Sequence, residues 1–158
     1  MSKAKKTVVA VSGGFDPPHV GHVRMFEAAK KLGDELVVIL NNDNWLRRKK
    51  RLVFMPENER KKMIESLKPV DRVILTKHIP NTDDMSVCEA LKELRPDVFA
   101  NGGDRTAGTI PENAVCAAIG CEAVFGVGKG GKVQSSSWLL ENYKKALMDG
   151  DAGKKRLS

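Results

Sequence analysis

Residues 7–22 read TVVAVSGGFDPPHVGH, in which a short apolar run leads directly into a turn rich in glycine and proline. The run from Thr7 to Ser12 has the continuous apolar character of a strand that is buried on both faces. The glycines that follow allow a tight turn and a close approach of the backbone to a ligand. An amphipathic pattern from Val20 to Leu32 predicts a helix immediately after the turn. The stretch therefore predicts a strand, a ligand-binding turn and a helix in succession.

The same alternation continues along the chain. Strands that alternate with helices of ten or so residues indicate an α/β fold, here a Rossmann-like, doubly wound, parallel five-stranded sheet with helices on both faces. Ligands in such sheets bind beyond the carboxyl ends of the strands. Between the second strand and the second helix, residues 41–51 are expected to form a polar segment and a basic loop. The further predicted strands are 35–40, 70–75, 98–100 and 122–125, and the further helices are 56–67, 86–94, 111–119 and 136–147.

Composition and charge narrow the class of protein. The chain has 158 residues, with 27 Lys and Arg against 20 Asp and Glu, and a formal net charge of +7. This length predicts one domain over residues 7–148, between a basic tail (1–6) and a flexible tail (149–158). Five consecutive basic residues lie in 47–51, so a localised anion site is favoured over a nucleic-acid-binding surface. Short apolar runs and three cysteines without metal or disulfide spacing predict a cytoplasmic protein that does not insert into membranes.

Two histidines stand three residues apart at the predicted start of the first helix. His19 and His22 can face the same side of that helix. The free backbone N–H groups of a helix start favour a bound phosphate, and imidazole N–H groups there can stabilise charge on a transferring phosphate. We therefore predict that both histidines are catalytic. Around them, the residues expected to contact a nucleotide are Gly13, Gly14, Phe15, Asp16 and Gly21.

The segment GGFDPPHVGH resembles the signature of the cytidylyltransferase-like nucleotidyltransferase superfamily. The small glycerol-3-phosphate cytidylyltransferases and the adenylyltransferases of the ADP-heptose type look most similar, and archaeal FAD synthetases share the signature. Three further segments resemble family motifs in the same order along the chain. They are the basic residues 49–51 with 57–60, the segment NGGDR at 101–105, and GVGKGGKVQSSS at 126–137.

This resemblance implies roles for further residues. Lys49 or Lys50 would bind the triphosphate and assist catalysis, Arg51 would stand where relatives carry a lysine, and Arg60 would bind the phosphate of the acceptor. The nucleotide would be approached by Gly102 and Asp104 of the second motif. The third motif would hold the β- and γ-phosphates through Lys129, Lys132, Ser135, Ser136 and Ser137.

The predicted function is nucleotidyl transfer, in which an NTP and a small phosphorylated acceptor give a nucleoside-diphospho product and pyrophosphate. CTP is the favoured nucleotide; the alternative is adenylyl transfer from ATP to a sugar phosphate or an FMN-like acceptor. A non-catalytic nucleotide sensor on the same fold is a more remote alternative. The resemblance also implies a homodimer and Mg²⁺ (or another divalent metal) bound with the NTP, with Asp16 and Asp104 as candidate ligands. We expect small-molecule partners and no nucleic acid.

Overall fold

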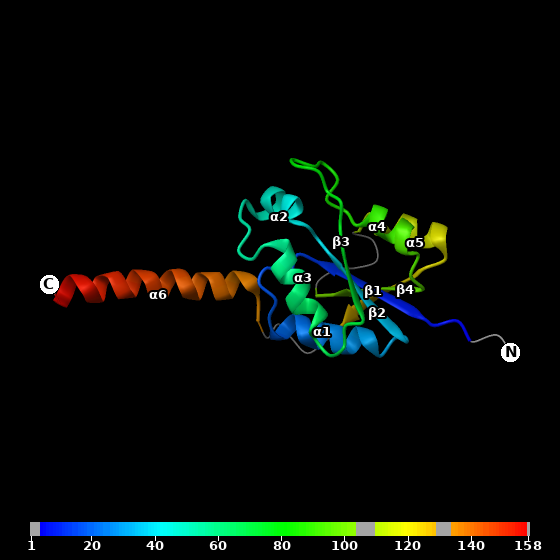
Figure 1. Cartoon of the computed structure of the whole chain (residues 1–158), viewed down its shortest axis with the longest axis horizontal. Coiled ribbons are helices and arrows are strands. Elements are labelled where there is room, and N and C mark those ends of the chain that lie inside the picture. The colour runs from blue at the N-terminus through cyan, green and yellow to red at the C-terminus, as the bar shows by residue number, and fades with distance from the viewer. Residues whose placement is uncertain (1–3, 104–109, 129–133, 158) are drawn as a thin grey trace.

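Five parallel strands form one sheet in the order β3-β2-β1-β4-β5 in the computed structural model, which describes residues 4–103, 110–128 and 134–157. The predicted fold class, an α/β doubly wound sheet, is thereby confirmed (Figure 1). The strands are β1 (Val8–Gly13), β2 (Glu35–Leu40), β3 (Arg72–Leu75), β4 (Val98–Gly102) and β5 (Glu122–Val127).

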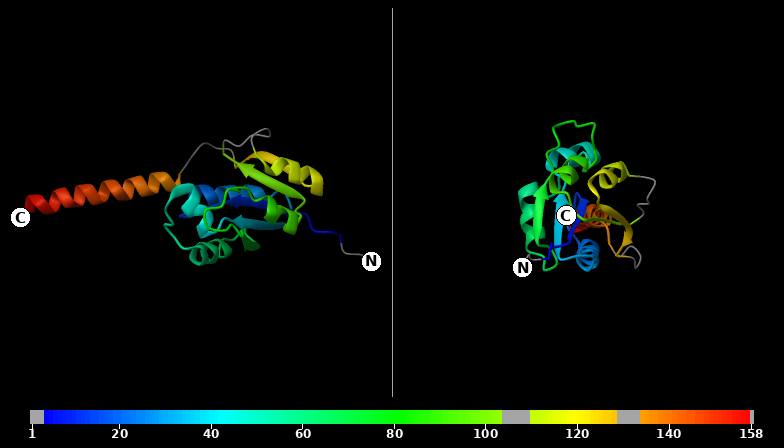
Figure 2. Two further views of the ribbon diagram at one scale, coloured as in Figure 1. Left: turned by 90° about the horizontal axis from the view of Figure 1, so that it is seen from above. Right: turned by 90° about the vertical axis from the view of Figure 1, so that its right-hand side faces the viewer.

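Helices cover both faces of the sheet because successive strand residues point to opposite sides (Figure 2). Val9 and Val11 pack on one side with Phe26 of α1 (Val20–Lys30). Ala10 packs on the other side with Leu91 of α4 (Cys88–Leu94). The helices are α1 (Val20–Lys30), α2 (Asp43–Lys50), α3 (Glu57–Glu65), α4 (Cys88–Leu94), α5 (Glu112–Ile119) and α6 (Ser136–Leu157).

The strand order reverses at β1, and this reversal decides where a ligand can bind. β1 pairs with β2 on one side, with Gly13 opposite Leu40, and with β4 on the other, with Ala10 opposite Phe99. The connections from β1 and from β4 lead away in opposite directions, which opens a crevice beyond the carboxyl ends of these two strands. Residues 14–18, the glycine turn after β1, lie at this crevice.

The main difference from the sequence prediction lies between β2 and α3. Residues 43–50, expected to belong to a polar segment and a basic loop, form the helix α2. The side chain of Asn42 caps this helix by accepting a hydrogen bond from the Trp45 N–H (3.0 Å). Four basic residues in the last turn interact favourably with the negative end of the helix dipole. Of its residues only Leu46 is buried, so no apolar stripe indicates this helix in the sequence.

The last helix is also longer than predicted. α6 runs from Ser136 to Leu157, whereas the sequence predicts an end near Leu147 and a flexible tail over 149–158. Figures 1 and 2 show that it projects away from the body of the molecule. Among the described parts of the chain, no helix is long and apolar enough to cross a membrane.

Candidate active site

The two histidines form the N-terminal cap of α1. The Gly21 N–H donates to Nδ1 of His19 (3.1 Å), and the His19 N–H donates to Nδ1 of His22 (3.2 Å). This reciprocal arrangement is a capping box, a motif usually built from Ser or Thr with Glu or Gln. The two rings stack with their centroids 3.6 Å apart. The predicted pair is therefore brought together, and its orientation is fixed by the helix start.

These hydrogen bonds also decide which ring nitrogen carries the proton. A neutral imidazole has one donor and one acceptor nitrogen, and here each Nδ1 accepts from the backbone. Burial, the neighbouring His19 and the nearby Lys50 lower the pKa of His22 to about 3. His22 is therefore neutral at pH 7, and its Nε2–H is a donor that no capping bond uses.

Phe15 holds the His22 ring against the core. Its side chain is buried and packs edge-on against His22, with centroids 4.7 Å apart, and against Phe26, with centroids 5.1 Å apart. Phe15 takes a positive φ of 47°, which directs its side chain under the turn instead of into solvent. Gly13 makes room for this ring, since a Cβ there would lie 2.7 Å from Phe15 Cζ.

A cleft of about 260 Å³ opens beside His22 at the carboxyl ends of β1 and β4. Five separate segments contribute to it: the end of β1 with the glycine turn, α1, the end of α2, the end of β4 and the start of α6. The residues that line it are Ser12, Gly13, Gly14, Phe15, His22, Met25, Lys50, Ala100, Asn101, Gly102 and Ser136. Of the predicted residues, His22, Lys50 and Ser136 thus meet the glycines at this edge of the sheet, whereas His19 is not part of the lining.

The basic residues at the end of α2 do not share one environment. Lys49, Lys50 and Arg51 are all exposed, but of the three only Lys50 lines the cleft. Earlier in the helix, Arg48 Nε donates to the Thr82 carbonyl (3.2 Å) and Arg47 lies within 3.5 Å of Asn44 Oδ1. The structure therefore distinguishes Lys50 from its neighbours, which the sequence could not do.

The serine-rich segment begins α6 at the mouth of the cleft. Ser136 is buried and its Oγ donates to the Pro17 carbonyl (3.1 Å), which joins α6 to the glycine turn. Ser135 caps the helix by accepting from the Trp138 N–H (3.1 Å), while Ser137 is exposed. The cleft therefore faces a helix N-terminus, whose partial positive charge favours an anion.

Arg60 differs from the expectation that it binds the acceptor phosphate. Its side chain is 0% exposed and uses four of its five N–H donors within the protein. They go to the carbonyls of Met55 (2.8 Å), Gly14 (2.7 Å) and Asn41 (2.8 Å), and to Oδ1 of Asp43 (2.7 Å). The guanidinium thus ties together the glycine turn, the end of β2 and the start of α2. In this structure Arg60 holds these three segments in place and does not itself face the cleft.

Asp16 is likewise turned away from a direct ligand role. Its carboxylate is buried and accepts from the N–H groups of Phe54 and Met55, both at 2.7 Å. These bonds hold the segment between α2 and α3 against the glycine turn. Asp16 was expected to contact nucleotide or metal; the structure instead shows a carboxylate with both oxygens bound to the backbone.

Replacing Arg60 with Lys is expected to destabilise the fold. A single ammonium cannot reproduce the planar fork, so two or more buried acceptors lose their partner, at roughly 1–3 kcal/mol each. Urea unfolding should show a loss of about 2–5 kcal/mol. The matched change Lys62→Ala, at an exposed position of the same helix, should stay within about 0.5 kcal/mol of the parent. Unchanged stability of Arg60→Lys together with a raised KM for the acceptor would instead support the original expectation.

A comparison with protein families identifies the chain's relatives. Residues 10–120 match the cytidylyltransferase-like family model; they hold most of β1, all of β2, β3 and β4, and the cleft except its α6 wall. The chain belongs to the cytidylyltransferase-like family. The resemblance seen in the sequence is therefore confirmed.

Curated members of this family with similar sequences are archaeal proteins named FAD synthase. The protein from Ferroglobus placidus is 43% identical over 100 residues, which are 63% of this chain and 60% of that one. The protein from Archaeoglobus profundus is 40% identical over 97 residues, which are 61% of this chain and 58% of that one. The chain thus matches about 60% of the length of these relatives.

Two solved structures share the fold. The lipopolysaccharide core biosynthesis protein from Thermoplasma volcanium is 31% identical with a TM-score of 0.62, over 77% of this chain and 96% of that one. A protein of unknown function from Archaeoglobus fulgidus is 16% identical with a TM-score of 0.57, over 82% and 96% of the two chains, and shows the fold alone.

Some residues suggested by the family motifs lie outside the described part of the chain, namely Asp104, Lys129 and Lys132. Among the described residues, the cleft also contains four that were not predicted as site residues. Ser12 and Asn101 end β1 and β4 with polar side chains, and their position before the glycine motifs could have indicated them. Nothing in the sequence indicates Met25 or Ala100 as a site residue, because apolar residues of a helix or strand are expected to pack in the hydrophobic core. Of the predicted residues, Gly21 lies under the His19 ring, where a Cβ would be 2.9 Å from His19 Cε1.

The described residues hold no cluster of side chains that could bind a divalent metal by themselves. Nowhere in the described ranges do three His, Cys, Asp or Glu side chains come together, and the oxygens of Asp16 are occupied by backbone N–H groups. Mg²⁺ is often bound mainly by substrate phosphates and water. Asp104, the other candidate ligand, lies outside the described residues.

Proposed function

We propose that this family member is a nucleotidyltransferase that joins an NTP to a phosphorylated acceptor and releases pyrophosphate. The observation that carries the proposal is the meeting of His22, Lys50 and the α6 N-terminus in one cleft. Each of these presents a hydrogen-bond donor or positive charge to the same space. Phosphates are the ligands that such a set of groups recognises.

The reaction has a simple balance. An oxygen of the acceptor phosphate attacks the α-phosphorus, the bond to the bridging oxygen of the β-phosphate breaks, and pyrophosphate leaves with the electron pair. A phosphate monoester has a second pKa near 6, so it is already a nucleophile at pH 7 without a general base. The protein then needs only to align the two phosphates and stabilise the developing charge.

The cleft residues fit these two tasks. The Nε2–H of His22, which no capping bond uses, would donate to the α-phosphate oxygens, whose negative charge the transition state redistributes. Lys50 would neutralise the triphosphate, and Ser136 with the α6 N-terminus would hold its leaving end. A non-catalytic sensor would gain nothing from a preorganised neutral donor such as His22 beside the phosphate.

We further propose ATP as the nucleotide and FMN as the acceptor, so that the product is FAD. The relatives named FAD synthase, at 40% and 43% identity, support this adenylyl alternative over CTP. The preference for CTP in the sequence analysis rests on the resemblance to the small cytidylyltransferases. The order of the motifs along the chain does not separate these enzymes from the adenylyltransferases.

Incubation of the purified protein with each of the four NTPs and with FMN, glycerol-3-phosphate or a sugar phosphate tests the proposal. We expect pyrophosphate release with ATP and FMN, and FAD as the product on chromatography. A product formed from CTP and a polyol phosphate would instead show that the protein transfers a cytidylyl group. Absence of pyrophosphate from every pair, with nucleotide binding retained, would favour the sensor.

A further inference from the structure

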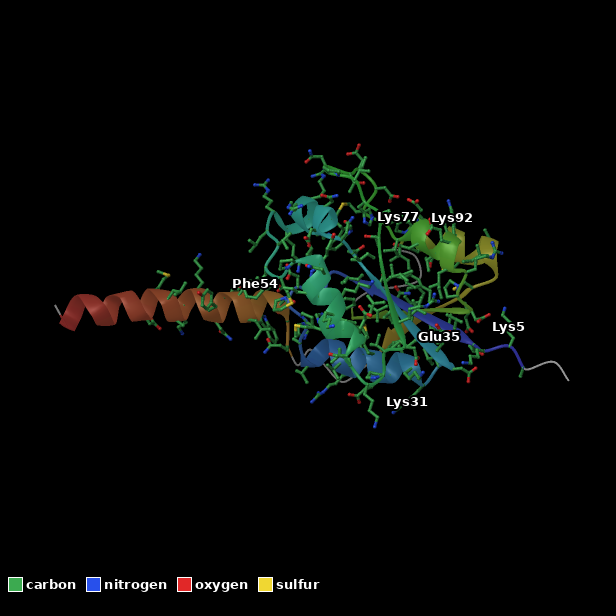
Figure 3. The ribbon with its side chains drawn as sticks, in the orientation of Figure 1. Lys5, Lys31, Glu35, Phe54, Lys77 and Lys92 are labelled. Carbon is green, nitrogen blue, oxygen red and sulfur yellow. The ribbon has the colours of Figure 1, made fainter. Side chains whose placement is uncertain are left out.

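The loop between β3 and α4, residues 76–87, lies alongside α2 (Figures 1 and 2). Lys77, which Figure 3 labels, is near its beginning. Within the loop, Thr82 is buried and its Oγ1 donates to the Asp84 carbonyl (3.1 Å). Oδ1 of Asp84 accepts from the N–H (2.9 Å) and from the O–H (2.6 Å) of Ser86. These bonds give the loop a defined shape, so it is able to support a neighbouring element.

The element that it supports is α2, whose side chains bind the loop through its backbone. Asn44 Nδ2 donates to the carbonyl of His78 (2.9 Å), Trp45 Nε1 to that of Met85 (3.0 Å), and Arg48 Nε to that of Thr82 (3.2 Å). Leu46 is the buried residue of this helix, so apolar packing holds it at one position. The bonds to the loop therefore decide much of where α2 lies.

The same helix also contacts the glycine turn. A Cβ at Gly14 would lie 2.9 Å from Leu46 Cδ2 and 3.1 Å from Trp45 Cζ3. The indole of Trp45 thus reaches Gly14 with its ring and Met85 with its N–H. Because Gly14 lines the cleft, the bonds between α2 and the loop are connected to the site itself.

α2 ends at Lys50, which supplies a positive charge to the cleft. A lysine side chain is long and has many rotamers, so the reach of its ammonium depends on where the last turn of the helix lies. Arg48 is two residues before Lys50, within that last turn. We propose that Trp45 and Arg48 are positioning residues that hold the end of α2 so that Lys50 reaches the phosphates. This role rests on the proposed function, in which Lys50 binds the triphosphate.

Neither positioning residue is part of the lining of the cleft. Trp45 has no charge, so it cannot attract a phosphate over a distance. The Nε–H of Arg48 is used on the loop. Hydrogen bonds weaken steeply as distance and angle depart from their preferred values, so a small shift of the helix end is enough to remove the contact of Lys50 with a phosphate.

Titration of the intact chain with ATP and with CTP, each with Mg²⁺, tests the proposal, and the nucleotide that the parent binds more tightly is used for the variants. Lys50→Ala should raise the Kd by about tenfold or more. Trp45→Phe and Arg48→Met each remove one bond to the loop and should raise the Kd about three- to tenfold. In the Lys50→Ala background, the same two changes should alter the Kd by less than about twofold, because the residue through which they act is gone.

Two comparisons separate positioning from charge. Trp45→Phe removes an N–H donor and leaves the net charge unchanged. Arg47→Met is the matched control for Arg48→Met, because it removes the same charge from the same helix. Arg47 lies within 3.5 Å of Asn44 Oδ1 and makes no bond to the loop in the described structure. Its Kd should stay within about twofold of the parent, since an isolated surface charge contributes little.

Four results would contradict the proposal or part of it. An unchanged Kd in Trp45→Phe and Arg48→Met, with only a lower melting temperature, would show that both residues are merely structural. Losses of the same size in the Lys50→Ala background would show that they act without Lys50. An equal loss in Arg47→Met would overturn the role of Arg48. A parent that binds neither nucleotide would refute both this role and the proposed function, whereas the expected binding without pyrophosphate release from any substrate pair would refute the proposed function alone.

Discussion

His22→Asn is expected to lower the turnover number by about 10²–10³ while the protein remains folded. The amide oxygen of Asn can take the place of Nδ1 and accept from the His19 N–H, so the helix cap survives. No donor then remains where Nε2–H stood. If this donor acts mainly in the transition state, kcat should decrease far more than the affinity for NTP. Pyrophosphate release and nucleotide titration measure the two effects.

His22→Gln is the matched control. Its amide nitrogen can lie near the position of Nε2 and donate, but no acceptor remains for the His19 N–H. This variant should lose about 1 kcal/mol of stability through the weakened cap and keep at least tenfold more turnover than His22→Asn. If His22→Asn keeps more than a tenth of the parental turnover, or if activity in both variants simply follows the folded fraction, His22 has a structural role only.

The lowered pKa of His22 provides a second way to compare His22→Asn with the parent, through the pH dependence of stability. Unfolded histidine takes up a proton near pH 6.5, whereas His22 in the fold does so only near pH 3. Between these values the unfolded chain binds more protons, so this residue reduces stability as the pH falls from 6.5 towards 3. Urea unfolding of His22→Asn should therefore depend less on pH in that window than unfolding of the parent. An identical pH dependence would contradict a buried, neutral His22.

Lys50→Ala should raise the KM for NTP or lower kcat/KM by about 10- to 100-fold. A hydrogen bond to a charged group typically contributes about 1.5–3 kcal/mol, and Lys50 lines the cleft. The effect should shrink at high salt as the charge is screened. Steady-state kinetics with each substrate varied in turn measures the change and shows which phosphate the lysine serves.

Lys49→Ala provides the comparison, because Lys49 precedes Lys50 in the same helix turn but lies outside the cleft. Its kinetic constants should stay within about twofold of the parent, since an isolated surface charge contributes little. Equal losses in the two variants would mean that the end of α2 acts only through its summed charge, and that the position of Lys50 is unimportant.

The sequence alone determined the fold class and predicted the edge of the sheet at which a ligand would bind. Strands such as Glu35–Leu40 are continuous apolar runs between polar turns, and this pattern reports burial directly. The glycine turn with His19 and His22 could be identified because its unusual residues are adjacent in the chain. Ligand binding beyond the carboxyl ends then followed from the parallel arrangement.

Only the tertiary structure decided what each polar side chain does. Arg60 and Asp16 read in the sequence as ligands for phosphate or metal, yet both are buried and satisfied by backbone groups distant in the chain. Lys49 and Lys50 are equivalent in sequence and differ only because a helix turn of 100° per residue sends them in different directions. The sequence pattern reports burial and backbone conformation, which are local. Hydrogen-bond partners and access to the cleft depend on long-range packing, so they become visible only when the strands and loops are assembled.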